Sequence, residues 1–195
     1  MAELPVFPLS SVLFPQGQLA LRIFEPRYVD MVSRCLRGDG SFGICLIAEG
    51  NETGVPATPH AIGTEAVIVD WDRHDDGLLG LTVRGGRRFQ IESRRIEADK
   101  SQTADVIWLE DAAQLLPDAF EQMADLLRQV LLELQPELTE SVENFSDANW
   151  VSYRLAECLP IPVTLRQQML ADNDPVHRLK QLASMLHQAA QSAGH

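Results

Sequence analysis

The hydrophobic residues of the first 112 positions fall in short runs with the spacing of β-strands. Residues 18–24 place Leu19, Leu21 and Ile23 at alternate positions, as in a strand with one buried face. Residues 42–50 (FGICLIAEG) form a continuous apolar run, which predicts a strand buried on both faces. Further strands are expected at residues 4–9, 64–71, 78–85, 87–98 and 104–110. Many short strands joined by turns favour a closed, barrel-like antiparallel sheet.

A single helix is expected among these strands, beginning near Pro26. Proline is well placed in the first turn of a helix, where its missing N–H costs nothing. An apolar stripe at helical spacing follows, and Gly38 is a plausible end of the helix. The stripe consists of Tyr28, Met31, Val32, Cys35 and Leu36.

The pattern changes near residue 112, after which leucine and alanine recur at helical spacing. Four helices are expected, with starts near Pro117, at Ser146 or Asp147, at Pro162 and at Asp174–Pro175. The sequence therefore predicts an α+β protein, with a β-rich pseudo-barrel at residues 1–112 and a helical bundle at residues 113–195.

The charge, the cysteine content and the lengths of the apolar runs indicate where the protein is located and which partners are disfavoured. The chain carries 28 acidic and 16 basic residues, a net charge of −12, which repels polyanions at long range. The three cysteines, at positions 35, 45 and 158, indicate a reducing compartment and no disulfide framework. The N-terminus lacks the pattern of a secretory signal, and no apolar run approaches the roughly 20 residues of a membrane span. We therefore expect a cytoplasmic protein without a membrane partner.

Several segments together resemble the N-terminal substrate-recognition domain of Lon proteases. Residues 24–28 read Phe-Glu-Pro-Arg-Tyr, an element with which that family opens its first helix. FGICLI (42–47), IGTEAVIVDW (62–71) and LTVRGGRRFQI (81–91) match later strands in order and spacing. Residues 150–186 are similar to the helical part of the family, with a Leu-Pro break and an Arg-Leu pair at Arg178 and Leu179. The resemblance covers about residues 4–187.

The resemblance implies a PUA-like pseudo-barrel and a helical bundle that recognise polypeptides and perform no chemistry. We expect a stand-alone form, because the sequence has no GxxxxGK[ST] motif of an ATPase. Neither Lys100 nor Lys180 lies in the context of a Ser-Lys peptidase. We assign no catalytic residue, metal ligand or cofactor, and the sequence leaves the peptide-binding residues and the oligomeric state open.

Two features allow alternative interpretations. Arg27 or Tyr28 in the Phe-Glu-Pro-Arg-Tyr element can line a peptide groove, although an architectural role is favoured, with Phe24 and Tyr28 packed and Arg27 paired with a carboxylate. The only basic cluster permits an RNA-binding hypothesis, against which stand the net charge and the absence of interleaved exposed aromatic residues. That cluster consists of Arg84, Arg87, Arg88, Arg94 and Arg95.

The remaining candidate residues carry little chemistry. The histidines at positions 60, 74, 177, 187 and 195 show no ligand spacing, and Asp72–Gly77 around His74 is typical of a hairpin turn. Ser10 and Ser11 have no adjacent general base. The leading hypothesis is a non-catalytic module that binds unfolded or specific polypeptides. The alternatives are a small-molecule binder or hydrolase that uses the cleft between the two parts, and an RNA-binding PUA-like protein.

Overall fold

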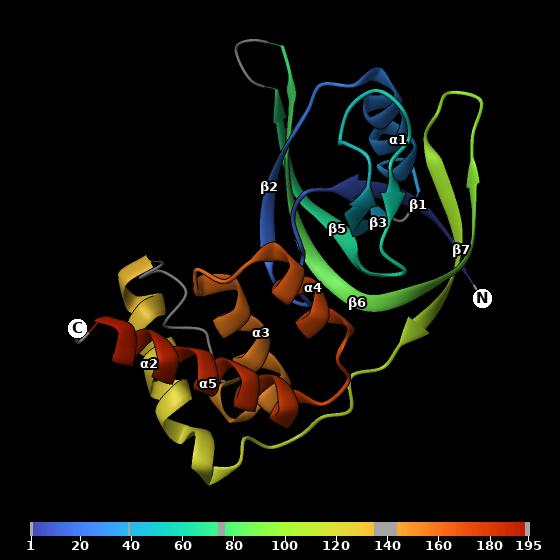
Figure 1. The fold of residues 1–195 in the computed structure, drawn as a ribbon. Helices are drawn as coiled ribbons and strands as arrows, with labels where there is room; N and C mark the ends of the chain where they lie inside the picture. Colours follow the sequence, from blue (N-terminus) through green and yellow to red (C-terminus); the bar gives the residue numbers. More distant parts are fainter. Residues whose placement is uncertain (1, 39, 74–76, 135–143, 194–195) are drawn as a thin grey trace. The chain divides into compact units, whose positions relative to one another are not determined.

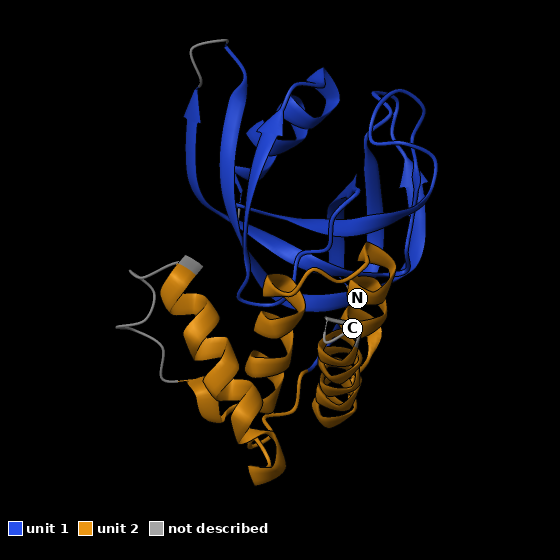
Figure 2. Ribbon diagram, turned by 60° about the vertical axis from the view of Figure 1, so that its left-hand side comes forward, with its two compact units in different colours: residues 1–110 blue, residues 111–195 orange. Residues whose placement is uncertain are grey.

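The chain folds into two compact units, residues 1–110 and 111–195 (Figure 2). The computed structural model describes the whole chain except residues 1, 39, 74–76, 135–143 and 194–195. The sequence pattern placed the change from strands to helices after residue 112. The turn around His74, Asp75 and Asp76 lies outside the described residues.

Unit 1 is a seven-stranded sheet that closes into a ring over the described residues (Figure 1). Its order is β1-β7-β6-β5-β3-β4, with antiparallel neighbours, and a parallel pairing of β1 with β3 completes the ring. β2 pairs with β6 off this path. The predicted α+β class and barrel-like sheet are confirmed. The strands are β1 Ala2–Leu9, β2 Gln18–Ile23, β3 Ser41–Glu49, β4 Thr58–Pro59, β5 Ile62–Arg73, β6 Leu79–Ile96 and β7 Gln102–Leu109.

β6 corrects one prediction, because residues 79–96 form one long strand where the sequence suggested two. The chain runs on through Gly85, whose main-chain N–H and C=O bond to Gly17 O at 2.8 Å and Gln16 N at 2.7 Å. A Cβ atom at Gly85 would collide with the main-chain oxygen of Phe14. Glycine at this point therefore reflects a close approach of two backbones and does not end the strand.

β1 contains two prolines, which the sequence analysis took as a limit on its length. Residues 2–6 pair with β7, and residues 6–9 pair with β3. Pro5 and Pro8 therefore each lie where β1 has a strand on one side only, so a missing N–H can face the other side. The prolines divide the strand between two partners and do not shorten it.

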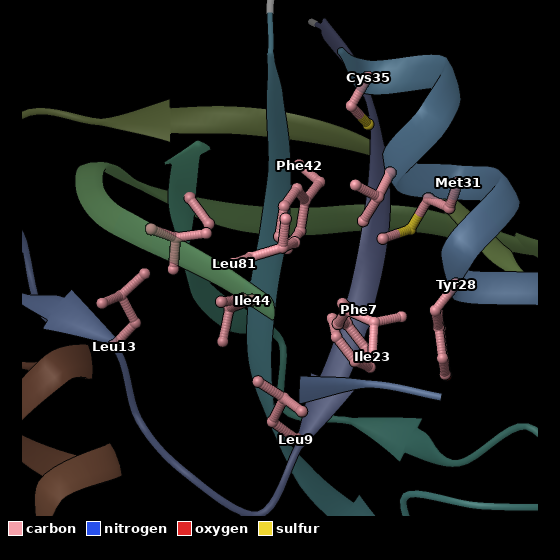
Figure 3. Close-up of a cluster of buried hydrophobic side chains, with 13 residues drawn as sticks. Phe7, Leu9, Leu13, Ile23, Tyr28, Met31, Cys35, Phe42, Ile44 and Leu81 are labelled. Atoms are coloured by element: carbon pink, nitrogen blue, oxygen red, sulfur yellow. The ribbon is translucent and has the colours of Figure 1, made fainter. Parts of the chain in front are cut away.

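One core cluster of unit 1 lies between the ring and helix α1, Pro26–Cys35 (Figure 3), and a second is formed by strand residues around Phe89. Pro26 is the first helical residue, as predicted, and the predicted stripe is buried at Tyr28, Met31, Val32 and Cys35. These side chains pack with Phe7, Leu9, Ile23, Phe42, Ile44 and Leu81 from the strands. Leu36 is 42% exposed, so its assignment to the stripe was wrong. It lies at the C-cap, one residue beyond the end of the helix.

Unit 2 contains the helices α2 Glu121–Leu134, α3 Ala148–Cys158, α4 Val163–Ala171 and α5 Pro175–Ala193. Short 3-10 turns at Asp118–Phe120 and Asn144–Ser146 precede α2 and α3. Asp147 caps α3 by accepting the N–H of Asn149 at 2.8 Å. Asp174 accepts the N–H of Val176 at 2.9 Å at the start of α5. Each side chain satisfies an N–H that lacks a partner inside the helix, which confirms both predicted starts.

A buried arginine ties α3 to α5 within unit 2. Arg178 is fully buried, and its guanidinium donates to Ser152 Oγ at 3.0 Å and Asn149 Oδ1 at 2.7 Å. A third bond reaches the main-chain oxygen of Asp172 at 2.6 Å. The guanidinium also stacks on the ring of Tyr153 at 4.0 Å. A buried cation is tolerated when its donors are satisfied in this way, so this cluster is structural.

Candidate functional site

A hollow of about 220 Å³ lies beside strand β2 in unit 1. We call it the β2 groove and define it by its lining. β1 and the following loop contribute Phe7, Leu9 and Ser11. β2 and the start of α1 contribute residues 19–25 and Tyr28, and Glu52 completes the lining. Most of the lining is hydrophobic, which suits an apolar side chain better than a small polar ligand.

The apolar part of the groove combines buried and exposed side chains. The rings of Phe7 and Tyr28 lie 4.1 Å apart, and Leu19 and Leu21 are partly buried beside the core cluster. Phe24 is 55% exposed. The prediction that Phe24 is packed was therefore wrong, whereas the same prediction for Tyr28, which is 3% exposed, is confirmed. β2 ends at Ile23 and α1 begins at Pro26, so Phe24 lies in the connection and outside the alternation that buries Ile23.

Arg27 holds the connection between β2 and α1 in place. Its guanidinium is buried and lies 3.0 Å from a carboxylate oxygen of Glu25, which confirms the predicted ion pair. It also donates to the main-chain oxygens of Lys100 at 3.1 Å and Glu52 at 3.4 Å. Arg27 does not line the groove, whereas Tyr28 does. Burial raises the pKa of the Tyr28 hydroxyl, and the nearby Arg27 opposes that rise.

Glu52 brings a negative charge to the rim of the groove. Its Oε1 accepts the main-chain N–H of Ser10 at 2.6 Å, which orients the side chain. Among the residues that the structure describes, the ion pairs place a cation on Glu25 and none on Glu52. The charged residues of the lining are therefore Arg22, Glu25 with its ion pair to Arg27, and Glu52, whose carboxylate a cationic group of a ligand can neutralise.

A second, larger hollow of about 640 Å³ in unit 1 has a different character. Its charged residues pair with each other, as Arg95 with Glu3 at 2.6 Å and with Glu97 at 2.9 Å. Arg34 lies 3.6 Å from Asp99 across the same hollow. Since these charges already neutralise one another, this surface offers less to a partner than the β2 groove.

The basic cluster suggested for RNA is divided among separate partners. Arg88 is fully buried, and Arg87 stacks on the ring of Trp108 at 4.0 Å. Arg94 donates to the Gln102 side chain at 2.6 Å and the Ala57 main chain at 2.9 Å. Arg95 pairs with Glu3 and Glu97. These contacts commit most of the cluster to the protein itself.

The possible metal ligands and the cysteines of the described residues do not form a second candidate site. Within the described ranges, no three His, Cys, Asp or Glu side chains are close enough to hold a metal ion. Cys35, Cys45 and Cys158 are not joined in disulfides, and the first two are buried as small hydrophobic residues, as predicted. Burial raises the pKa of the Cys45 thiol, which keeps it protonated.

Sequence patterns alone did not reveal the groove residues. Leu19 and Leu21 show the alternation of an ordinary half-buried strand. Among the described strands β2 pairs with β6 only, which leaves its other edge beside a hollow. One feature of the sequence could have indicated that Phe24 is exposed. It directly follows Ile23, so it does not share the alternate positions of Leu19, Leu21 and Ile23 that form the buried face.

The closed ring of unit 1 and the helices of unit 2 define an α+β protein with the fold of Lon N-terminal domains. An N-terminal domain of a Lon protease from the Mycobacterium avium complex superposes with a TM-score of 0.70 at 17% identity, over 94% of this chain and 97% of that one. The chain belongs to the family described as the ATP-dependent protease La (LON) substrate-binding domain, which matches residues 3–188.

Two relatives show the extent of the similarity. The crystal structure of a Lon N-terminal domain protein from Xanthomonas campestris is 38% identical, with a TM-score of 0.80, over 94% of this chain and 98% of that one. The Lon protease of Anaeromyxobacter dehalogenans is 25% identical over 195 residues, covering 95% of this chain. The chain spans about a quarter (23%) of that protease. No helix among the described residues is both long and apolar enough to cross a bilayer.

Proposed function

We propose that this chain is a non-catalytic recognition module that binds apolar segments of polypeptides in the β2 groove. The exposed side chain of Phe24, set beside a hollow lined by Leu19 and Leu21, is the observation that carries the proposal. Exposed aromatic residues at the rim of an apolar depression are typical of protein interaction sites, because they bury large areas at low entropic cost.

Membership of a substrate-binding family supports this function, since the matched part of the Lon proteases is described by substrate binding. The proposal includes no catalysis, and we expect no peptidase or ATPase activity from this chain. The proposed location is the cytoplasm, which suits three cysteines that are not joined in disulfides.

Fluorescence anisotropy tests the proposal directly. Labelled peptides of 10–15 residues, taken from a permanently unfolded protein and ranked by apolar content, are titrated with the chain. We expect saturable binding that strengthens with apolar content and is blocked by an excess of the unlabelled unfolded protein. Absence of saturable binding to every peptide would falsify the proposal.

A matched pair of variants locates the site. Phe24→Ala removes an exposed groove residue, and we expect it to weaken binding at least about fivefold, the effect of losing a modest interface anchor. Val55→Ala removes a side chain that is 80% exposed and does not line the groove, so binding should be unchanged. Equal effects of the two substitutions would place the binding site elsewhere.

A further inference from the structure

The β2 groove is bordered by the edge of a strand and not by the face of a sheet. β2 is paired with β6 along residues 18–23, and the described strands provide no second neighbour for it. The groove contacts every residue from 19 to 25 in succession. Since successive side chains of a strand point to opposite faces, a hollow that contacts consecutive residues must lie along the strand's edge.

The apolar side chains on one face of β2 also line the groove beside its edge. Leu19, Leu21 and Ile23 point to the same side and are opposite Val83, Leu81 and Leu79 of β6. On the far side of the groove, Phe7 and Leu9 of β1 present further apolar surface. A strand added along β2 would direct alternate side chains between these two apolar walls.

The charge of Glu52 favours some added segments over others. Arg27 neutralises Glu25, whereas Glu52 is held in place by Ser10 N–H and has no cationic partner among the described residues. A positive group of a ligand beside Glu52 would complement this carboxylate, and a negative group at the same place would be repelled. Arg22, on the exposed face of β2, also lines the groove, so the preference for a cation applies to the position beside Glu52.

We propose that the β2 groove takes an extended polypeptide segment that pairs as an added strand with the outer edge of β2 and places a Lys or Arg beside Glu52. The segment is about six residues long, to match β2, with apolar side chains at alternate positions. Main-chain hydrogen bonds supply affinity for many sequences, and the apolar alternation and single cation supply selectivity. This inference rests on the proposed function, because it specifies how the groove binds.

Backbone methylation of the peptide tests the added strand. The best binder from the anisotropy titration is resynthesised with one N-methyl group at each position in turn. In an added strand, alternate N–H groups face β2, so methylation at every second position should weaken binding at least about tenfold while the intervening positions tolerate it. Uniform tolerance, or loss without a two-residue period, overturns the added strand.

Charge exchange tests the cation beside Glu52. Glu52→Gln removes the charge and keeps an oxygen for Ser10 N–H. We expect it to weaken a Lys-containing peptide about threefold, as for a partly exposed ion pair, and to leave the Lys→Gln peptide unchanged. Glu49→Gln, an exposed acid of β3 outside the groove, is the control. Equal effects of Glu52→Gln on both peptides overturn the role of Glu52.

The outcomes separate this inference from the function on which it rests. Binding that depends on Phe24 but ignores both methylation and Glu52 leaves the recognition function standing and overturns the added strand. Absence of any peptide binding by the correctly folded chain overturns both. Circular dichroism of each variant verifies the fold before binding is measured.

Discussion

The Arg178 cluster of unit 2 and the β2 groove of unit 1 differ in how far their groups are satisfied by contacts within the chain. At Arg178, a fully buried cation finds three oxygen acceptors and an aromatic face. At the groove, Phe24 is 55% exposed, and β2 has one strand edge without a partner strand among the described residues. One region satisfies its groups within the chain, and the other leaves apolar area and hydrogen-bonding capacity available.

The difference separates residues that stabilise the protein from residues that are available for binding. Groups satisfied inside the chain contribute to folding, and their loss leaves buried polar atoms without partners. Groups left open contribute little to folding, so their substitution changes binding more than stability. Substitutions at the two regions should therefore have opposite effects on the two measurements.

The largest effect is expected at Arg178. Arg178→Ala removes the donor to three oxygen acceptors, two of them in buried contacts, and opens a cavity. We expect a loss of about 3–5 kcal/mol in the free energy of unfolding. Urea denaturation followed by circular dichroism at 222 nm measures the loss in the helical unit. Peptide binding should be unchanged under conditions where the variant is folded. A loss below about 1 kcal/mol would contradict the structural role.

The next effect is expected where two backbones meet in unit 1. Gly85→Ala places a methyl group against the main-chain oxygen of Phe14. Because backbone atoms on both sides must shift, we expect a loss of about 1–3 kcal/mol. Gly38→Ala is the control, since its Cβ would find ordinary contacts at 3.6 and 3.8 Å. It should be neutral or stabilise the chain by up to about 1 kcal/mol. Equal behaviour of the two variants would contradict the close approach.

The fold could be predicted largely because its signals are local. The run at residues 42–50 is buried through Leu46 because β3 is a strand of the ring between β1 and β5, and its two faces enter different core clusters. Phe42 and Ile44 belong to one cluster and Cys45 to the other. Asp147 and Asp174 marked helix starts through a property of the backbone itself, the unsatisfied N–H groups of the first turn. Such features depend on a few neighbouring residues and are visible in the sequence.

The features that escaped prediction depend on distant parts of the chain. Gly85 looks like the end of a strand until Phe14, about seventy positions away in sequence, passes against it. The groove borders an edge of β2 that has no partner strand in the described part of the chain, and strand neighbours cannot be read from alternation within one strand. Arg27 was expected to pair with a carboxylate, but its bond to the Lys100 main chain required the folded structure.

A small effect on stability is expected at Phe24, in contrast to its effect on binding. Phe24→Ala should change the free energy of unfolding by no more than about 0.5 kcal/mol, because more than half of the side chain is already in water. Phe42→Ala, at a fully buried position, should cost about 3–5 kcal/mol. Urea midpoints of the two variants give the comparison. A loss at Phe24 as large as that at Phe42 would mean that the groove is part of the folding core.

The smallest effect is expected at Asp99, an exposed polar contact in the turn between β6 and β7. Its Oδ1 accepts the hydroxyl of Ser101 at 2.6 Å and the N–H of Ser101 at 2.8 Å. The Ser101 hydroxyl is the main cause that lowers the pKa of Asp99 below its ordinary value of 3.8, and Arg34 adds to it.

Because the pKa of Asp99 is lowered in the folded state, its ionised form stabilises the protein above pH 3.8, and this contribution is lost as the pH falls through the folded value. Asp99→Asn keeps the oxygen acceptor and removes the charge. The variant should therefore be slightly less stable than the natural chain at pH 6 and equally stable near pH 2, as measured by urea unfolding at each pH. Only the part due to Arg34 should weaken in high salt, since short hydrogen bonds are not screened. A stability difference that persists unchanged at pH 2 would show that the oxygen geometry, and not the charge, stabilises this turn.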